Sequence, residues 1–240
     1  MRRQSSMEHF WNARAREDAF FFVDNRLAYR APDHERFWAK GVDDLDHILA
    51  ALGVAVAPTD AVIEIGCGIG RLTRPLSERA LTVHAVDVSG EMLRRARAGN
   101  PDLGNVTWIR GNGHDLAPLP TACVDACFSH VVFQHIPDPA VTLGYVREMA
   151  RVLRPGGWAG FQLSTAAHVH SPRGAARRAR ALLAGLLGRR PRGQDHPAWR
   201  GSAVDLDELR TVAGGAGLDV ERVEGAGTQF CLVLLRRRGV

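Results

Sequence analysis

Residues 61–73, AVIEIGCGIGRLT, constrain the fold of this chain more than any other stretch. The apolar first half is typical of a short buried strand, with Glu64 near its end. The turn that follows carries three glycines in GxGxG spacing, at Gly66, Gly68 and Gly70. Because glycine has no Cβ, such a turn can adopt positive φ and let a ligand approach the main chain. The stretch therefore predicts a strand that leads into a ligand-binding turn.

The spacing of the glycines separates two kinds of nucleotide site. A dinucleotide fingerprint needs GxGxxG, so that a pyrophosphate can sit on the N-terminus of the following helix. In this chain Arg71 occupies the position of the third glycine of that fingerprint. Glu64 would also repel a pyrophosphate, whereas its carboxylate would attract an ammonium group. The turn therefore favours a ligand that carries an ammonium group.

Composition narrows the class of protein. With 240 residues, of which 45% are hydrophobic and 24% charged, the chain can form one α/β domain with a full core. No apolar run approaches the roughly 20 residues that span a bilayer. The N-terminus also lacks the apolar segment of a secretion signal. These features predict a cytoplasmic protein with no membrane contact.

Neither a metal nor a nucleic acid is expected as a partner. The four cysteines form no CxxC pair and no zinc-ligand spacing, so they are interpreted as buried reduced thiols. The net charge of +5 could indicate nucleic-acid binding. However, Lys40 is the only lysine among 31 basic residues, a skew that fits a GC-rich coding bias better than selection for phosphate binding.

From residue 61 onward, short apolar runs alternate with helical patterns, which is typical of βαβ units and a parallel sheet. Strands are predicted at 61–65, 81–87, 106–110, 126–130 and 158–163, with two further apolar runs at 218–223 and 228–235. One helix is predicted to start within residues 72–80, and three others are predicted at 90–99, 141–153 and 206–213. Ser89 is expected to cap the second of these helices, and Arg154 to Gly157 to end the third.

Two segments fall outside this pattern. Residues 1–56 hold half of the aromatic residues and predict an N-terminal cap of two or three helices over a core of residues 57–240. Trp11, Phe20 and Tyr29 are candidates to line an apolar substrate pocket, whereas most aromatic residues of the segment are expected to anchor the helices to the sheet.

The second segment, 166–200, is an insertion that contains seven arginines between Pro172 and Arg192. It is interpreted either as a solvated lid helix or as a wall that binds an anionic substrate. In the second interpretation Arg177, with Arg178 and Arg180, would contact the substrate.

Further motifs follow the strands in order. Asp87 ends the second strand, where a carboxylate can accept hydrogen bonds from both hydroxyls of a ribose. Residues 111–116, GNGHDL, come after the third strand. Residues 124–139 include the fourth strand and VVFQHIPDP, and RVLRPGGW at 151–158 precedes the fifth. Together with the glycine turn, these five motifs resemble those of the class I S-adenosylmethionine-dependent methyltransferases, over residues 60–163.

The resemblance implies a Rossmann-like, doubly wound α/β sheet of seven strands that ends in an antiparallel hairpin. It also implies S-adenosylmethionine as the cofactor. Asn112 stands where the family usually has an acid that contacts adenine, and His114 and Asp115 are alternatives for that contact. The implied cofactor-binding residues are Glu64, Gly66, Cys67, Gly68, Gly70, Asp87, Val88, Asn112, Gly113, His114, Ser129 and His130.

The methyl group of this cofactor is already activated, so alignment of the acceptor should dominate catalysis. A histidine could act as general base, and the candidates are His130, His135, His168 and His170. We expect metal-free transfer to an O, N or C atom of a small molecule of secondary metabolism, by a monomer or homodimer. The alternatives are a non-catalytic, cofactor-binding scaffold and a methyltransferase of RNA, protein or peptide.

Overall fold

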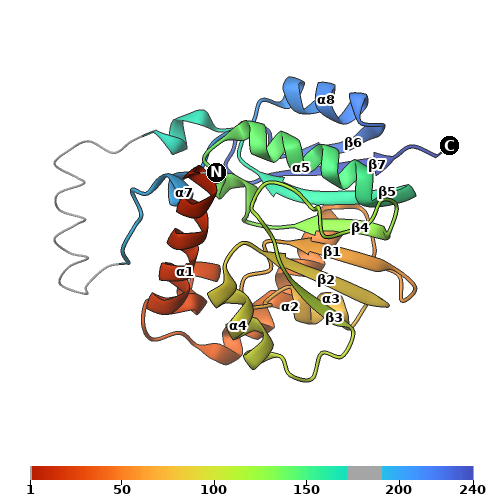
Figure 1. The fold of residues 1–240 in the computed structure, drawn as a ribbon. Coiled ribbons are helices and arrows are strands. Elements are labelled where there is room, and N and C mark those ends of the chain that lie inside the picture. Colours follow the sequence, from red (N-terminus) through yellow and green to blue (C-terminus); the bar gives the residue numbers. More distant parts are fainter. Residues whose placement is uncertain (1, 172–190, 240) are drawn as a thin grey trace.

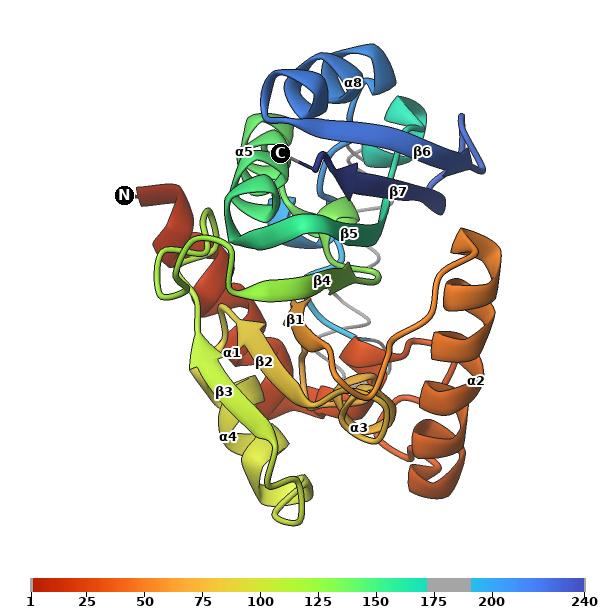
Figure 2. The ribbon, with the colours of Figure 1, turned by 90° about the vertical axis from the view of Figure 1, so that its right-hand side faces the viewer.

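The computed structural model describes residues 2–171 and 191–239 of the chain. Its strands form one sheet in the order β3-β2-β1-β4-β5-β7-β6 (Figures 1 and 2). Neighbours from β3 to β5 pair in parallel, whereas β7 pairs antiparallel with both β5 and β6. The strands are β1 (Ala61–Ile65), β2 (Thr82–Asp87), β3 (Val106–Arg110), β4 (Val124–Ser129), β5 (Leu153–Leu163), β6 (Leu218–Glu224) and β7 (Cys231–Arg237). This confirms the predicted Rossmann-like sheet with its final hairpin.

Helices cover both faces of the sheet. One apolar cluster joins α2 and α3 to the sheet, and another joins α5 and α8 to its opposite face (Figure 2). The α-helices are α1 (Arg2–Val23), α2 (His34–Leu52), α3 (Thr73–Ser77), α4 (Gly90–Gly99), α5 (Pro139–Val152), α7 (Pro197–Arg200) and α8 (Leu206–Gly215). Two 3-10 turns, η1 (Phe133–His135) and η2 (Ala167–His170), follow β4 and β5.

Local sequence signals explain where several helices begin. The Ser89 side chain accepts a hydrogen bond from the amide of Met92, which confirms the predicted cap of α4. Asp138 caps α5 in the same way by accepting from the amide of Ala140, and a proline occupies the first turn. These caps fix the starts of helices whose apolar sides pack on the sheet.

Helix α5 ends at Val152, next to the predicted stop signal, but the turn expected after it is part of a strand. Arg154 to Gly157 do not form a turn between helix and strand, because β5 already begins at Leu153 and runs through them. Leu153 pairs with Val124 of β4, and the register then shifts before Ala126 pairs with Trp158. The proline and glycines are accommodated by this irregularity in the strand rather than by a separate loop.

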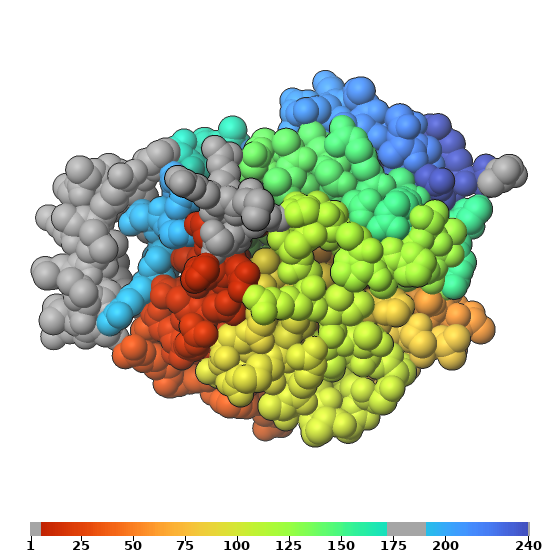
Figure 3. Space-filling model, in the orientation of Figure 1, coloured from red at the N-terminus to blue at the C-terminus, as the bar shows by residue number. Residues whose placement is uncertain are grey.

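The N-terminal segment forms α1 and α2, and non-helical backbone at Asp18 (φ −169°, ψ 87°) divides α1 into two helical stretches, which gives three helices, within the predicted range of two or three. Helix α1 packs against α4 and α7, beyond the carboxyl ends of the parallel strands (Figure 1). In the space-filling view, the red surface of α1 adjoins the yellow surface of the α4 region (Figure 3). Helix α1 therefore forms a cover at the edge of the sheet where the predicted motifs converge.

Within residues 2–171 and 191–239, none of the helices combines the length and the hydropathy that a bilayer crossing requires. Most of the predicted arginine-rich insertion, including Arg177, Arg178 and Arg180, lies outside the described residues.

Candidate active site

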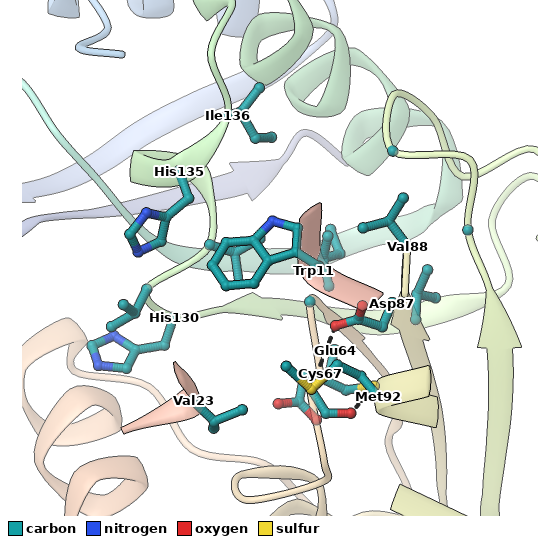
Figure 4. Close-up of a pocket in the computed structure, with 18 of the residues that line it drawn as sticks. Trp11, Val23, Glu64, Cys67, Asp87, Val88, Met92, His130, His135 and Ile136 are labelled. Carbon is teal, nitrogen blue, oxygen red and sulfur yellow. Dashed lines mark hydrogen bonds between the residues drawn. The ribbon is translucent and has the colours of Figure 1, made fainter. Parts of the chain in front are cut away.

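A cavity lies at the carboxyl ends of β1, β2 and β4, beneath α1. Its walls come from the turn after β1, the end of β2, the loops after β3 and β4, and α1 itself. Figure 4 shows Glu64, Cys67 and Asp87 on one side of the cavity and His130 and His135 on the other. An open α/β sheet places its ligand in this position, next to the strand where the order of connections reverses.

The glycine turn has the backbone that its sequence predicts. Gly66, Gly68 and Gly70 have φ values of 79°, 55° and 90°, which residues other than glycine rarely adopt. A Cβ on Gly66 would overlap Val132 across the cavity wall, and one on Gly68 would lie 2.9 Å from Val23 Cγ2 of α1. Gly70 does not line the cavity; a Cβ there would meet Asn100 and Trp108. The first two glycines therefore open the cavity, whereas the third permits packing behind it.

Asp87 joins the glycine turn to the start of α4. Its Oδ2 accepts a hydrogen bond from the amide of Gly68 at 2.9 Å, and its Oδ1 accepts from the amide of Ser89 at 2.7 Å. Burial raises the pKa of this carboxyl to about 6, against the lowering effect of the two amides. In the described part of the chain no cation pairs with Asp87. Its remaining lone pairs can thus accept hydrogen bonds from a ligand in the cavity.

Glu64 is buried beneath the turn and also lines the cavity. Its Oε2 accepts a hydrogen bond from the hydroxyl of Thr73 at 2.5 Å. Burial raises the pKa of Glu64 from 4.5 to about 7, although Thr73 and the nearby Arg71 act to lower it. A ligand ammonium at this position would favour the ionised carboxylate.

The raised pKa of Glu64 predicts a pH-dependent stability. Between about pH 4.5 and pH 7 the unfolded chain loses this proton while the folded chain keeps it, so the free energy of unfolding falls as pH rises. At about 1.4 kcal/mol per unit of pKa, the loss is roughly 3 kcal/mol. Urea unfolding of the ligand-free protein at pH 4.5 and 7.5 measures it. Glu64→Gln should remove this part of the dependence and leave the part that the raised pKa of Asp87 contributes, whereas the exposed Glu221→Gln should keep the wild-type dependence. Equal slopes in all three proteins would contradict the assignment.

The loop after β3 contributes less to the cavity than its motif predicts. Asn112 holds the loop together, because its Oδ1 accepts from the amides of His114 and Asp115. His114 is partly exposed and pairs with Asp115 at 2.8 Å. Neither Asn112 nor His114 lines the cavity, whereas Gly113 and Val88 do.

The end of β4 delivers two neighbouring residues to different environments. Ser129 is buried, and its hydroxyl donates to the carbonyl of Ile65 at 2.8 Å, so it fastens β4 to β1 and does not line the cavity. His130 lines the cavity, and its Nδ1 is buried without a hydrogen-bond partner among the residues described. Burial lowers the pKa of His130 to about 4, helped by the charge of Arg71. The imidazole is therefore neutral near pH 7.

His135 also lines the cavity, in one defined tautomer. Its Nδ1 lies 2.6 Å from the carbonyl oxygen of Trp199 and must donate to it, since a carbonyl only accepts. Its Nε2 therefore accepts from the Gln134 amide, 3.2 Å away, whose own oxygen accepts from Gln162. Burial lowers the pKa of His135 to about 4. This histidine is held on both sides by the protein.

The other two candidate histidines lie away from the cavity. His168 is exposed in η2, and His170 is engaged by the hydroxyl of Ser164 and the carbonyl of Arg200. The insertion follows β5, but His170 of η2 is bound to Arg200, the last residue of α7, instead of turning toward the strand ends. The structure therefore leaves His130 and His135 as the histidines that face the cavity among the four predicted.

The aromatic candidates divide similarly. Trp11 lines the cavity and packs edge-on against His135, with ring centroids 5.5 Å apart. Phe20 packs against Phe37 of α2, and the hydroxyl of Tyr29 donates to Glu17 at 2.5 Å. Phe20 and Tyr29 thus anchor the cap and do not line the cavity. Lining residues that sequence reasoning missed include Met7, Phe22, Val23, Arg71, Met92 and Tyr145.

One of the missed residues carried a sequence signal. Arg71 breaks the dinucleotide fingerprint, but the motif does not indicate that its side chain lines a site. Met7 lies one helical turn before Trp11, so the same face of α1 presents both to the cavity. The remaining lining residues are ordinary apolar side chains that no motif marks.

The strand order, the glycine turn and the carboxylate at the end of β2 define a methyltransferase of class I. The family model described as a methyltransferase domain matches residues 63–161, which contain these features. Residues 63–161 are thus a methyltransferase domain, and the fold is that of the class I S-adenosylmethionine-dependent methyltransferases, which use S-adenosylmethionine as cofactor.

Individual relatives agree with this class. The chain is 28% identical over 184 residues to a ubiquinone biosynthesis O-methyltransferase of Paracidovorax citrulli, which covers 72% of this chain and 69% of the relative. It is 36% identical to a malonyl-[acyl-carrier protein] O-methyltransferase of Serratia marcescens over 104 residues, 42% of this chain and 36% of the relative. A crystal structure of an S-adenosylmethionine-dependent methyltransferase from Mesorhizobium loti superposes with a TM-score of 0.59 at 22% identity, and covers 79% of this chain and 95% of that one.

Proposed function

We propose that this protein transfers the methyl group of S-adenosylmethionine to an oxygen atom of a small organic molecule. The observation that carries the proposal is a single cavity with carboxylates on one side and the unpartnered Nδ1 of His130 on the other. The two relatives described above are both O-methyltransferases, which supports oxygen as the acceptor atom.

In this proposal the cofactor spans the carboxylate side of the cavity. Asp87 accepts hydrogen bonds from the ribose hydroxyls, and Glu64 faces the ammonium group of the methionine end. Gly66, Cys67 and Gly68 provide the close main-chain approach between the two carboxylates. Val88 and Gly113 border the adenine. This donor set fits the cofactor because Asp87 has free lone pairs and a Cβ at either cavity-facing glycine would narrow the cavity.

The acceptor would occupy the space beneath α1, beside His130 and Trp11. When bound, the cofactor would supply a methyl group on a positively charged sulfur. The acceptor oxygen would bond to the methyl carbon in line with the C–S bond, and the sulfur would leave with the bonding electron pair. The protein holds the acceptor in this alignment, and the apolar side chains of α1 exclude water. His130 is neutral at pH 7, so its Nδ1 can accept the proton that the acceptor hydroxyl loses as the new C–O bond forms.

The cavity walls favour an acceptor with an apolar body. Met7, Trp11, Phe22 and Val23 of α1 face the cavity, and they match an aromatic ring or alkyl chain better than a charged polymer. We therefore infer a small metabolite with a hydroxyl or carboxyl group, such as an intermediate of quinone or natural-product biosynthesis.

An acceptor screen with trideuteromethyl-labelled cofactor tests this function. Phenols, aliphatic alcohols, carboxylic acids, amines and thiols are incubated with the purified protein, and mass spectrometry follows the label. Label on an oxygen supports the proposal, and label confined to nitrogen, sulfur or carbon overturns it. Binding of S-adenosylhomocysteine without turnover of any class would favour a cofactor-binding scaffold instead.

The role of His130 gives a specific prediction. With an acceptor from that screen, His130→Asn should lower kcat by about 100-fold, near the lower end of the effect of a general base, because a low pKa makes a weak base. The affinity for S-adenosylhomocysteine should change less than threefold. His168→Asn, at an exposed histidine, should retain wild-type kcat. Equal kcat values for the two variants would remove His130 from the reaction.

A further inference from the structure

Arg71 is a buried cation whose guanidinium is only partly satisfied. Its side chain is 6% exposed and lines the cavity directly after the glycine turn. Nη1 donates to Asp44 at 2.6 Å, but the buried Nε has no partner in the part of the chain that the structure describes. A buried N–H left unsatisfied costs the free energy of removing it from water. This cost would be recovered if a ligand in the cavity accepted a hydrogen bond from Nε.

Helix α2 and the segment before it hold this arginine in place. Asp44 of α2 accepts hydrogen bonds from both Arg71 and Arg26, and Arg26 also pairs with Asp24 at 2.6 Å. The two aspartates and two arginines of this network alternate, so their charges balance without a ligand. Gly41 allows the close approach, because a Cβ there would overlap the carbonyl of Arg71. Arg71 is thus a positioned side chain and not a solvated one.

The neighbours of Arg71 indicate which ligand group it meets. Arg71 and Glu64 both line the cavity and are close enough for the arginine to lower the pKa of Glu64. An acid beside a base is the complement of an α-amino acid, in which an ammonium and a carboxylate share one carbon atom. The methionine end of the cofactor carries this pair of charges, and Glu64 already faces the ammonium in the proposed placement.

We propose that Arg71 donates from Nε to the carboxylate of S-adenosylmethionine, and that Asp44 positions it for this contact. The inference rests on the proposed placement of the cofactor. It assigns the methionine end to a contact held by the N-terminal cap, so that Asp24, Arg26 and Asp44 contribute to cofactor binding without touching it.

Calorimetric binding of two ligands tests the contact without relying on turnover. The ligands are S-adenosylhomocysteine and 5′-(3-aminopropylthio)-5′-deoxyadenosine, which lacks only the carboxylate. Wild-type protein should bind the first about 10- to 100-fold more tightly. Arg71→Met should lose most of this preference by weakening the first ligand alone, because a charge-assisted hydrogen bond contributes roughly 1.5–3 kcal/mol.

Two further variants keep the test decisive. Arg79→Met removes another arginine that pairs with α2, through Asp46 at 2.8 Å and outside the cavity, and it should keep the wild-type preference. Asp44→Asn leaves the guanidinium but loosens its position, so it should reduce the preference partly. It also serves if Arg71→Met does not fold.

The outcomes separate this inference from the proposed function. If Arg71→Met weakens both ligands equally, or neither, Arg71 does not contact the carboxylate and the inference is wrong. If only the KM of an acceptor rises, Arg71 serves the acceptor instead. If the wild-type protein binds neither ligand, the proposed cofactor site itself fails.

Discussion

Replacing Asp87 with alanine is expected to lower the affinity for S-adenosylhomocysteine by about 10²- to 10⁴-fold. In the proposed site the carboxylate accepts two ribose hydrogen bonds, and bonds to a charged group contribute roughly 1.5–3 kcal/mol each. The variant also loses the contacts with the amides of Gly68 and Ser89, which hold the glycine turn against α4. Isothermal titration of the wild-type and variant proteins measures the change.

Two variants show whether the loss belongs to the carboxylate. Asp87→Asn keeps the shape and one acceptor oxygen, so its loss should be smaller than that of alanine. Asp102→Ala removes an exposed aspartate that pairs with Arg74 and should bind like the wild type. A ribose-binding role for Asp87 is untenable if Asp87→Ala binds the ligand within threefold of the wild type.

Replacing Gly201 with alanine is expected to destabilise the fold by roughly 3 kcal/mol or more. This glycine ends α7 with φ of 62° and ψ of −149°, a conformation that costs other residues about 1–3 kcal/mol. A Cβ there would also overlap the carbonyl of Gln134, so the backbone of η1 or α7 must move. At about 2–4 °C per kcal/mol, thermal unfolding should shift down by roughly 6–12 °C.

Gly214→Ala provides the matched control. Gly214 lies in α8, where no atom stands within 4 Å of a Cβ, so alanine should stabilise the helix by up to about 1 kcal/mol. An equal thermal shift for the two variants would contradict the close packing of α7 on η1. That packing matters for the site because Trp199 of α7 fixes the tautomer of His135.

The sequence was sufficient for those parts of the fold and site that depend on local pattern. The alternation of apolar strands and helices predicted the parallel part of the sheet, and the cap at Ser89 follows from the residue type at a helix start. Glu64, Gly66, Gly68 and Asp87 reach one cavity because parallel strands end at the same edge of a sheet. The order of these motifs along the chain therefore predicted that their residues meet at one site.

Contacts between distant segments could not be predicted in this way. His170 and His135 both follow strand ends, but only His135 lines the cavity. His170 is bound to Arg200, 30 positions away, and His135 to Trp199, 64 positions away. The motif does not distinguish Gly70 from the other two glycines, because its packing against Asn100 and Trp108 depends on distant segments. Arg71 gained its role from Asp44, an acid on a helix whose position no motif marks.

A crystal structure of the protein with S-adenosylhomocysteine would show directly how the cofactor lies in the cavity. We expect the ribose hydroxyls within hydrogen-bond distance of the Asp87 carboxylate, and the amino and carboxylate groups beside Glu64 and Arg71. The sulfur would then point toward the space beneath α1 that His130 borders. A ligand bound outside this cavity, or one with its ribose at His130 and its amino-acid end at Asp87, would rule out the proposed placement.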